Sequence, residues 1–281
     1  MANALATKND SDLSTTEQKA PSQALRSDLL APRLLLMQGL SDLVAEGKAR
    51  QGDIVKSLTG EKVGDMKTPI EFIPLAMQNA WMISEKLNGK YEYRKQIPRK
   101  AVVSNADAAA ERERDETDKQ ADDSAWDFKY LGNEWKRTKI INVYALLPGD
   151  IKAFQEEITK ALDSGEMPDL DKALLPVMIS FRSTSFTAGR KVATHFAKCA
   201  EMAQYGAKPY GYALTLGCAL QENDKGKFFV YDVSGSRRLT KEEFSEAAKL
   251  VGDVESGNVK VHDVSDEPAA MTTPDGDAPQ F

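Results

Sequence analysis

The chain has 281 residues, of which 41% are apolar and 28% are charged, and its mean hydropathy is −0.46. This is enough sequence for one large domain with an apolar core, and no apolar run approaches the roughly 18 residues that suggest a membrane-spanning helix. Two cysteines and two histidines are too few for a disulfide framework or a zinc cluster, so we expect no metal, no cofactor and a reducing, cytoplasmic location.

The net charge of −6 argues against a nucleic-acid partner until its distribution is considered. Residues 101–127 contain nine acidic and three basic side chains, and residues 253–281 contain seven acidic side chains and one lysine. Each segment therefore carries −6, and the rest of the chain carries +6. This asymmetry predicts a mildly basic body with two acidic appendages, although an ordinary surface can vary as much.

The N-terminal half predicts strands joined by turns. Residues 1–29 are polar and lack the apolar segment of a secretory signal, so we expect a disordered lead-in. Strands are expected at 32–38, 52–61 and 68–87, with a loop or short helix at 41–51. Pro69 and Pro74 favour an edge or bulged strand for the third of these. The Asn88-Gly89 pair is typical of a tight hairpin turn.

This turn leads into a basic, aromatic strand at 91–100 (YEYRKQIPRK), and a second such segment follows at 128–147 (FKYLGNEWKRTKIINVYALL). Strict alternation predicts that Tyr91, Tyr93 and Lys95 share one face of the first strand. The acidic segment between the two contains few large apolar residues. It is therefore expected to be either a disordered loop or a solvated helix.

The C-terminal half alternates helices with strands. Helices are expected at 148–162, 183–205 and 240–251, and strands at 174–181, 210–220 and 227–233. Asp150 is a candidate N-cap for the first helix, and Thr240 and Glu243 have the spacing of a capping box for the last. No pattern after residue 252 can bury a core, so 253–281 is expected to be a disordered acidic tail.

Strand runs followed by helices interleaved with strands indicate the α+β class. We expect a mainly antiparallel β core shaped as an OB-like, partly open barrel, with three peripheral helices and disordered termini. A single domain would span residues 30–252 and carry the charged insert at 101–127.

The sequence offers little catalytic chemistry. It contains no phosphate-binding GxxxxGK[ST] loop, no HExxH, no CxxC and no GxSxG. His195 is expected to pack beside the apolar stripe of its helix, and His262 lies in the tail. Carboxylates are abundant enough for a two-metal nuclease, but they cluster in segments expected to be flexible. We therefore expect a protein that is not an enzyme.

The two basic, aromatic segments are the candidate binding surface, because cations pair with phosphates and flat rings stack on bases. Candidates for these contacts are Tyr91, Tyr93, Arg94, Lys95, Arg99, Lys100, Trp126, Phe128, Lys129, Tyr130, Trp135, Lys136, Arg137, Lys139 and Tyr144. In the alternative interpretation, roughly half of the rings belong to the core and the cations only keep the protein in solution.

A second phosphate site is conceivable at residues 181–191 (FRSTSFTAGRK), where hydroxyl side chains precede Arg190 and Lys191 at a helix start. Simple N-capping by Ser183 or Ser185 explains the same residues and is favoured.

The end of the chain combines Asp275, Asp277, Pro279 and Phe281, with Gln280 before the last residue. It resembles the C-terminal tip of bacterial single-stranded DNA-binding proteins, an acidic run that closes on proline and a terminal phenylalanine. That resemblance implies that the tip docks into basic pockets of partner enzymes and can cover the protein's own DNA groove.

The layout over residues 30–250 is similar to that of bacteriophage single-stranded DNA-binding proteins. The segments that carry the likeness are PRLLLMQGLS, GDIVKSLTGE, FRSTSFTAGRKVATHF and YALTLGCALQENDKGKFFVYDV. The resemblance implies an OB-like core that holds the strand, an acidic tail for partner contacts and no enzymatic activity.

The leading hypothesis is thus a phage protein in the host cytoplasm that binds single-stranded DNA without sequence preference. Its acidic tail would contact replication or recombination proteins, with no membrane partner and with homo-oligomerisation left open. Two alternatives remain, a phage structural or assembly protein that binds no nucleic acid and a recombination protein that anneals single strands.

Overall fold

The computed structural model describes residues 30–39, 41–98, 127–130, 133–224, 226–255 and 260–261. The expectations for the lead-in at 1–29, for most of the charged insert and for the chain end after residue 261 lie outside these residues. Within them, no helix is long and apolar enough to cross a membrane.

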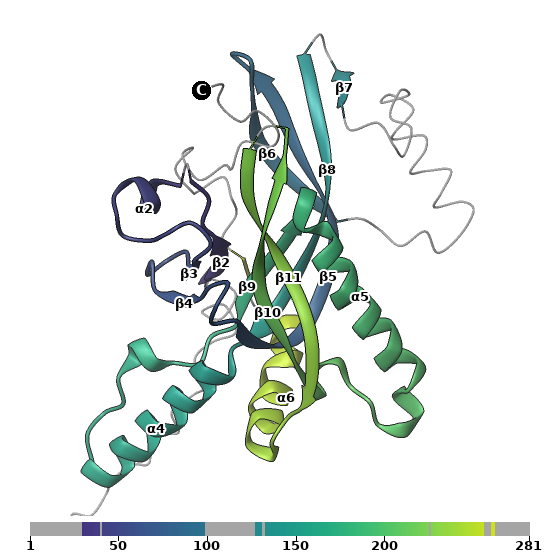
Figure 1. The fold of residues 1–281 in the computed structure, drawn as a ribbon. Helices are drawn as coiled ribbons and strands as arrows, with labels where there is room; N and C mark the ends of the chain where they lie inside the picture. The colour runs from purple at the N-terminus through teal and green to yellow at the C-terminus, as the bar shows by residue number, and fades with distance from the viewer. Residues whose placement is uncertain are drawn as a thin grey trace, which may run out of the picture.

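The chain forms twelve described strands (Figure 1). They are β1 (Leu30–Ala31), β2 (Arg33–Leu36), β3 (Ile54–Lys56), β4 (Lys62–Gly64), β5 (Ile70–Leu87), β6 (Lys90–Pro98), β7 (Asp127–Tyr130), β8 (Asn133–Leu146), β9 (Val177–Arg182), β10 (Tyr212–Asn223), β11 (Gly226–Arg238) and β12 (Lys260–Val261). The described α-helices are α2 (Asp42–Ala45), α4 (Pro148–Ser164), α5 (Phe186–Glu201) and α6 (Lys241–Glu255). Short 3-10 turns are η1 (Leu170–Lys172), η2 (Ser183–Ser185), η3 (Ala203–Tyr205) and η4 (Pro209–Gly211).

Ten strands form one curled sheet in the order β11-β10-β5-β8-β9-β2-β3-β4, with β6 beside β5 and β7 beside β8. All of these pairs are antiparallel except β2 with β9. A mostly antiparallel, curled sheet with long helices at its periphery confirms the α+β prediction and is consistent with an OB-like, partly open barrel.

Strand β5 lies in the middle of this sheet rather than at an edge. Its first residues pair with β10, its last residues pair with β6, and β8 runs along its other side. Of the two alternatives predicted for this strand, an edge position or a bulge, the structure confirms the bulge, because the register with β8 shifts between Pro74 and Ala76. Proline lacks the N–H that a regular ladder needs, and a bulge accommodates it.

The main core lies on one face of the curled sheet, which we call the core face. Its buried side chains come from β2, β3, β5, β8, β9, β10, β11 and α5, and they include Phe72, Val143, Ile179, Phe181 and Leu216. A smaller, second cluster on the opposite face, the outer face, packs the base of β5 and β8 against α4 and α6. Burial of apolar surface on both faces at the base of the sheet stabilises the body.

The curl brings β11 against the segment that follows β2. The Gln38 side chain donates from Nε2 to the Phe229 carbonyl (2.9 Å) and accepts at Oε1 from the Phe229 N–H (3.0 Å). The buried Tyr231 hydroxyl donates to the Leu34 carbonyl (2.7 Å), and burial raises the pKa of this phenol. These contacts join the open edge of the sheet to its other half.

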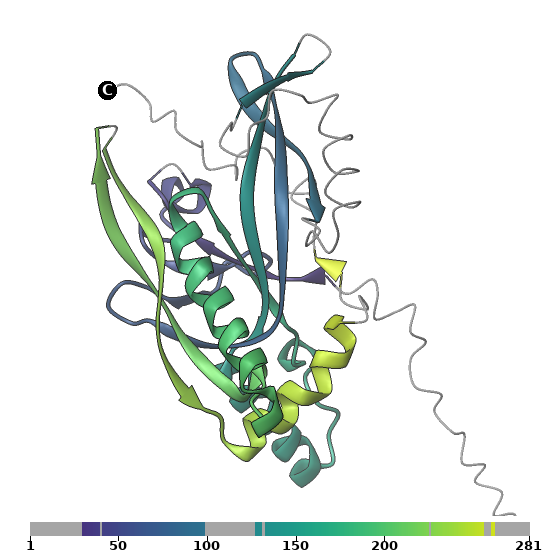
Figure 2. The ribbon, with the colours of Figure 1, turned by 90° about the vertical axis from the view of Figure 1, so that its right-hand side faces the viewer.

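Helix α5 covers the core face (Figure 2). Gly189 approaches the sheet so closely that an added Cβ would lie 2.7 Å from Phe181 Cβ and 3.2 Å from Ile141 Cβ. The predicted continuous helix over 183–205 is instead divided into η2, α5 and η3.

The helix starts differ in how they are capped. At α6 the predicted capping box forms, since Glu243 N–H donates to Thr240 Oγ1 (3.2 Å) and Thr240 N–H donates to Glu243 Oε2 (2.9 Å). Asp150 does not cap α4 and instead pairs with Lys56 Nζ at 2.9 Å. Ser185 lies at the N-cap of α5 without a capping bond, and its hydroxyl accepts from the Tyr231 N–H.

The described chain also continues past the tail boundary expected at residue 253. Helix α6 runs to Glu255, and β12 then pairs in parallel with β1. The sequence gives little sign of this because a two-residue strand has no periodicity to detect.

Arg237 of β11 forms ion pairs with both β5 and α6 at the base of the sheet. Its guanidinium contacts Glu71 of β5 at 2.7 Å and Glu243 of α6 at 2.7 Å. The hydrogen bonds from Arg237 lower the pKa of Glu243. A planar guanidinium can serve two carboxylates at once, which suits this junction.

We predict that Gly189→Ala lowers the free energy of unfolding by about 1–3 kcal/mol, because the new Cβ overpacks α5 against Phe181. Gly149→Ala in α4 is the matched control, since no heavy atom lies within 4 Å of its added Cβ. It should be neutral or stabilising by up to about 1 kcal/mol. Chemical denaturation measures both, and equal effects would contradict the close packing of α5.

The Arg237 junction predicts a dependence of stability on pH. Because the pKa of Glu243 is lowered in the folded state, its contribution is present above the unfolded value of about 4.3 and is lost as the pH falls through the folded value. Urea midpoints measured from about pH 6 to pH 3 should fall less steeply in Glu243→Gln and in Arg237→Gln than in the wild type. If the urea midpoints of all three proteins fell in parallel with pH, the Arg237 junction would not contribute to the pH dependence of stability.

Candidate nucleic-acid interface

Strands β5, β6 and β8 extend beyond the body as a long antiparallel ribbon, which Figures 1 and 2 show projecting past α5. We call this extension, residues 79–98 and 133–141, the arm. Its register is fixed by the pairs Trp81 with Lys139, Ser84 with Lys136, and Lys86 with Tyr91. Residues that alternate along these strands fall on its two faces.

The outer face of the arm carries one half-buried ring between two lysines. Lys86 Nζ lies 5.9 Å and Lys136 Nζ 5.5 Å from the centroid of the Tyr91 ring. Both distances are within the range of cation–π attraction. Lys86 also pairs with Glu134 at 2.7 Å, so part of the positive charge on this face is offset.

The core face of the arm carries a second ring and cation. Lys139 Nζ lies 5.4 Å from the centroid of the Trp81 ring, and both side chains are half-buried. Two residues farther along β8, Ile141 on the same face enters the main core. The pair therefore lies at the border between the apolar core and the projecting arm.

The predicted binding residues thus do not share one surface. Lys136 and Tyr91 lie together on the outer face, whereas Lys139 lies on the core face. The register with β5 also shifts between Ile83 and Ser84, so that Lys95 pairs with Ile83 and Tyr93 with Ser84. The predicted regular alternation of β6 is wrong at this bulge.

For several candidates the structure describes the backbone only. Trp135 pairs with Glu85 and Phe128, and Arg137 pairs with Ile83. Their side chains lie outside the described residues, together with those of Tyr93, Arg94, Lys95, Phe128, Lys129 and Tyr130. The described residues also exclude Arg99, Lys100, Trp126 and the tail residues Asp275, Asp277, Pro279 and Phe281.

Tyr144 belongs to the body rather than to the arm. It is half-buried against the second cluster, and burial raises the pKa of its phenol, an effect that nearby Arg33 partly offsets. Its ring therefore packs between the sheet and the helices at the base.

Arg190 and Lys191 are both exposed on the first turns of α5. Lys191 pairs with Asp232 of β11 at 2.6 Å, while Arg190 forms no ion pair with another described residue. These two cations lie on the core-face side of the sheet, because Gly189 beside them contacts Ile141 and Phe181.

Sequence reasoning missed Trp81 and Lys86. Trp81 lies within the apolar stretch at 68–87, outside the two basic, aromatic segments from which the candidates were taken. Lys86 could have been found, since a two-residue turn at Asn88-Gly89 places residue 86 directly opposite Tyr91.

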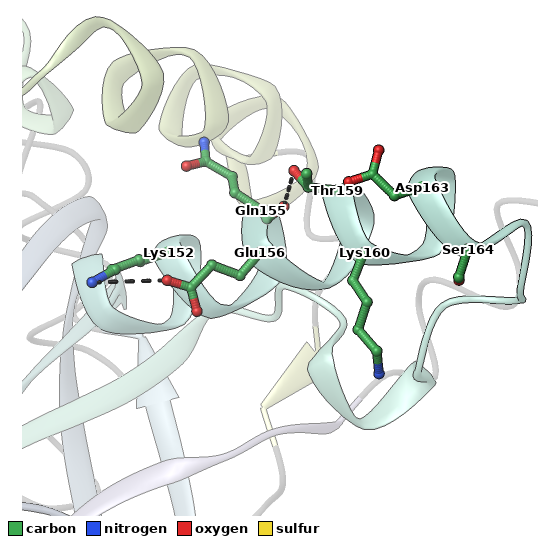
Figure 3. Close-up of a pocket in the computed structure, with 7 residues that line it drawn as sticks. All are labelled: Lys152, Gln155, Glu156, Thr159, Lys160, Asp163 and Ser164. Atoms are coloured by element: carbon green, nitrogen blue, oxygen red, sulfur yellow. Dashed lines mark hydrogen bonds and ion pairs between the residues drawn. The ribbon is translucent and has the colours of Figure 1, made fainter.

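Other parts of the described surface show fewer features of a binding site. The shallow hollow along α4 is lined by seven polar side chains, among them Lys152 and Glu156, which pair at 3.8 Å (Figure 3). Lys160 and Asp163 balance each other in the same hollow, so it presents no net charge to a ligand. Within the described residues, no group of three or more His, Cys, Asp or Glu side chains could hold a metal.

His195 is packed as expected, with Nε2 3.2 Å from the Pro209 carbonyl oxygen and its ring edge-on to Tyr212. Both cysteines are free and buried, and burial is the main reason that the pKa of each thiol is raised. Neither thiol is thereby prepared to act as a nucleophile.

Comparison with known proteins finds one similarity. Residues 167–260 match the family described as Pam3 phage gp34-like protein. No curated protein and no solved structure matches the chain. The matching region contains β9, α5, β10, β11 and α6, and the arm precedes it. The similarity supports a phage protein, and it leaves the function of that protein open.

If the Trp81 ring lies at the border of the core, its removal should cost far less stability than removal of a core ring. We expect about 1–2 kcal/mol for Trp81→Ala and about 3–5 kcal/mol for Phe181→Ala, which is fully buried. Denaturation midpoints compare the two. Equal losses would assign Trp81 to the core and remove it from the interface.

Proposed function

We propose that this protein binds single-stranded DNA without sequence preference, through the rings and cations of the arm. The observation that carries the proposal is the pairing of partly exposed rings with lysines, Trp81 with Lys139 and Tyr91 with Lys86 and Lys136. Rings in such a setting can stack on bases of any identity, and the cations can meet the phosphates between them.

The distribution of charge and the phage similarity support the same function. The chain outside its two acidic segments carries +6, and the arm projects from the body as a long ribbon of strands (Figure 1). Part of the chain matches a phage family, and phage replication and recombination both expose single strands that need protection. We therefore place the protein in that setting, without enzymatic activity of its own.

The acidic tail completes the proposal. Its terminal Phe281, with Asp275, Asp277 and Pro279, would recruit replication or recombination proteins, and its charge would compete with DNA for the basic surface. Self-association of the protein is compatible with this function.

We predict that the full chain binds labelled oligo-dT with micromolar or tighter affinity and that binding weakens steeply as salt is raised. The double variant Trp81→Ala/Tyr91→Ala, which removes one ring from each face of the arm, should lose at least about 1–3 kcal/mol of binding free energy, which is roughly a five- to 150-fold loss of affinity. Tyr205→Ala is the matched control, because this ring is 79% exposed in η3, which follows the end of α5 that lies away from the arm (Figure 1). Fluorescence anisotropy measures all three.

No binding at about 50 mM salt, even without the tail, would refute this function. Large assemblies whose size does not change with salt concentration or on addition of DNA would instead favour a structural or assembly protein. Rings or filaments on DNA that accelerate pairing of complementary strands would favour an annealing protein.

Deletion of residues 263–281 should tighten DNA binding at low salt, because it removes five acidic side chains and no lysine or arginine. The gain should disappear as salt is raised and the competing charges are screened. The comparison is an anisotropy titration of both chains at low and high salt. Unchanged affinity at low salt would show that the tail does not compete.

A further inference from the structure

Helix α5 is the only one of the three long described helices with a net positive charge. It carries Arg190, Lys191 and Lys198 against Glu201, which gives +2, whereas the same count gives −2 for α4 and −3 for α6. Its exposed side chains include all three cations and the hydroxyl residues Thr187 and Thr194. We call the row Thr187, Arg190, Thr194 and Lys198 the α5 stripe.

The α5 stripe lies on the same side of the sheet as Trp81 and Lys139. Gly189 rests on Ile141, and Lys139 is two residues away on β8, about 7 Å along the strand and on the same face. In Figure 2, α5 runs downward between the β10–β11 hairpin and the base of the arm. The N-terminal turns of α5 are therefore the part nearest the Trp81 ring.

The cations of the stripe are available to a ligand. Neither Arg190 nor Lys198 forms an ion pair with another described residue, and both are exposed. Lys191 beside them is held by Asp232, and the Thr194 hydroxyl donates to the Arg190 carbonyl. By contrast, Lys86 on the outer face of the arm is already paired with Glu134.

We propose that the single strand follows the core-face side of the protein, stacking at Trp81 beside Lys139 and continuing along the α5 stripe. Arg190 and Lys198 then contact phosphates, while the Tyr91 side of the arm is not part of the path. The stripe is about 16 Å long from Thr187 to Lys198, and its two cations are about 12 Å apart. They therefore reach different phosphates. This path rests on the proposed function and specifies which side of the arm performs it.

The test is the salt dependence of oligo-dT binding by the full chain. Each lost phosphate contact on a single strand reduces the slope of log K against log salt by about 0.7. Arg190→Gln/Lys198→Gln should therefore reduce the slope by about 1.4 and weaken binding on the order of tenfold or more near 50 mM salt. The control Lys160→Gln/Lys241→Gln removes two exposed cations from α4 and α6 and should leave the slope unchanged.

Variants that each remove one ring show which face of the arm binds the DNA strand. Trp81→Ala should weaken binding at least fivefold, whereas Tyr91→Ala should stay within about twofold of the wild type. Equal slopes for the stripe variant and its control, or a greater loss in Tyr91→Ala than in Trp81→Ala, would overturn this path while the protein still binds DNA. Failure of the wild type to bind would instead refute the proposed function itself.

Discussion

The curled sheet depends on contacts that hold β11 against the segment after β2. The side-chain amide of Gln38 forms hydrogen bonds with both the N–H and the carbonyl of Phe229, as the backbone of a neighbouring strand would. The Tyr231 hydroxyl adds a buried hydrogen bond to the Leu34 carbonyl. Each bond contributes only about 0.5–1.5 kcal/mol net, but a buried group left without its partner would cost about 1–3 kcal/mol. The arrangement therefore favours the curled sheet over a flat one, and the main core is enclosed as a result.

The length of β5 and its continuous register with β8 explain why the arm has two unlike faces. β5 is long enough for its first half to lie in the body and its second half to leave it, with the register to β8 uninterrupted from Ala76 to Glu85. The core face therefore continues from Ile141 to Lys139 and Trp81 without a change of side. On the side away from β8, β5 pairs with β10 at residues 70–72 and with β6 at residues 80–87, so the ribbon outside the body has neighbours on both sides of its central strand.

Local sequence signals predicted much of the fold, because each depends on a few adjacent residues. The Asn88-Gly89 turn and the Thr240 capping box are confirmed. What could not be predicted depends on distant parts of the chain, such as the parallel pairing of β2 with β9 and the partnership of Gln38 with a residue 191 positions away. Likewise, Asp150 is not the N-cap of α4, because the helix already begins at Pro148, and from the first turn its carboxylate pairs with Lys56 of β3.

The sequence predicted several residues of the candidate site but not how they are arranged on the two faces of the arm. The basic, aromatic composition of the two segments identified Tyr91, Lys136 and Lys139 as binding candidates, yet the register divides them between two faces and adds Trp81 as the ring beside Lys139. We expect a single strand to lie on this protein at the arm and α5. Photo-crosslinking of a bromodeoxyuridine oligonucleotide, followed by peptide mass spectrometry, tests it most directly. We predict crosslinks in the peptides that contain Trp81 and the N-terminal turns of α5, whereas crosslinks confined to α4 and α6, or none, would contradict the account.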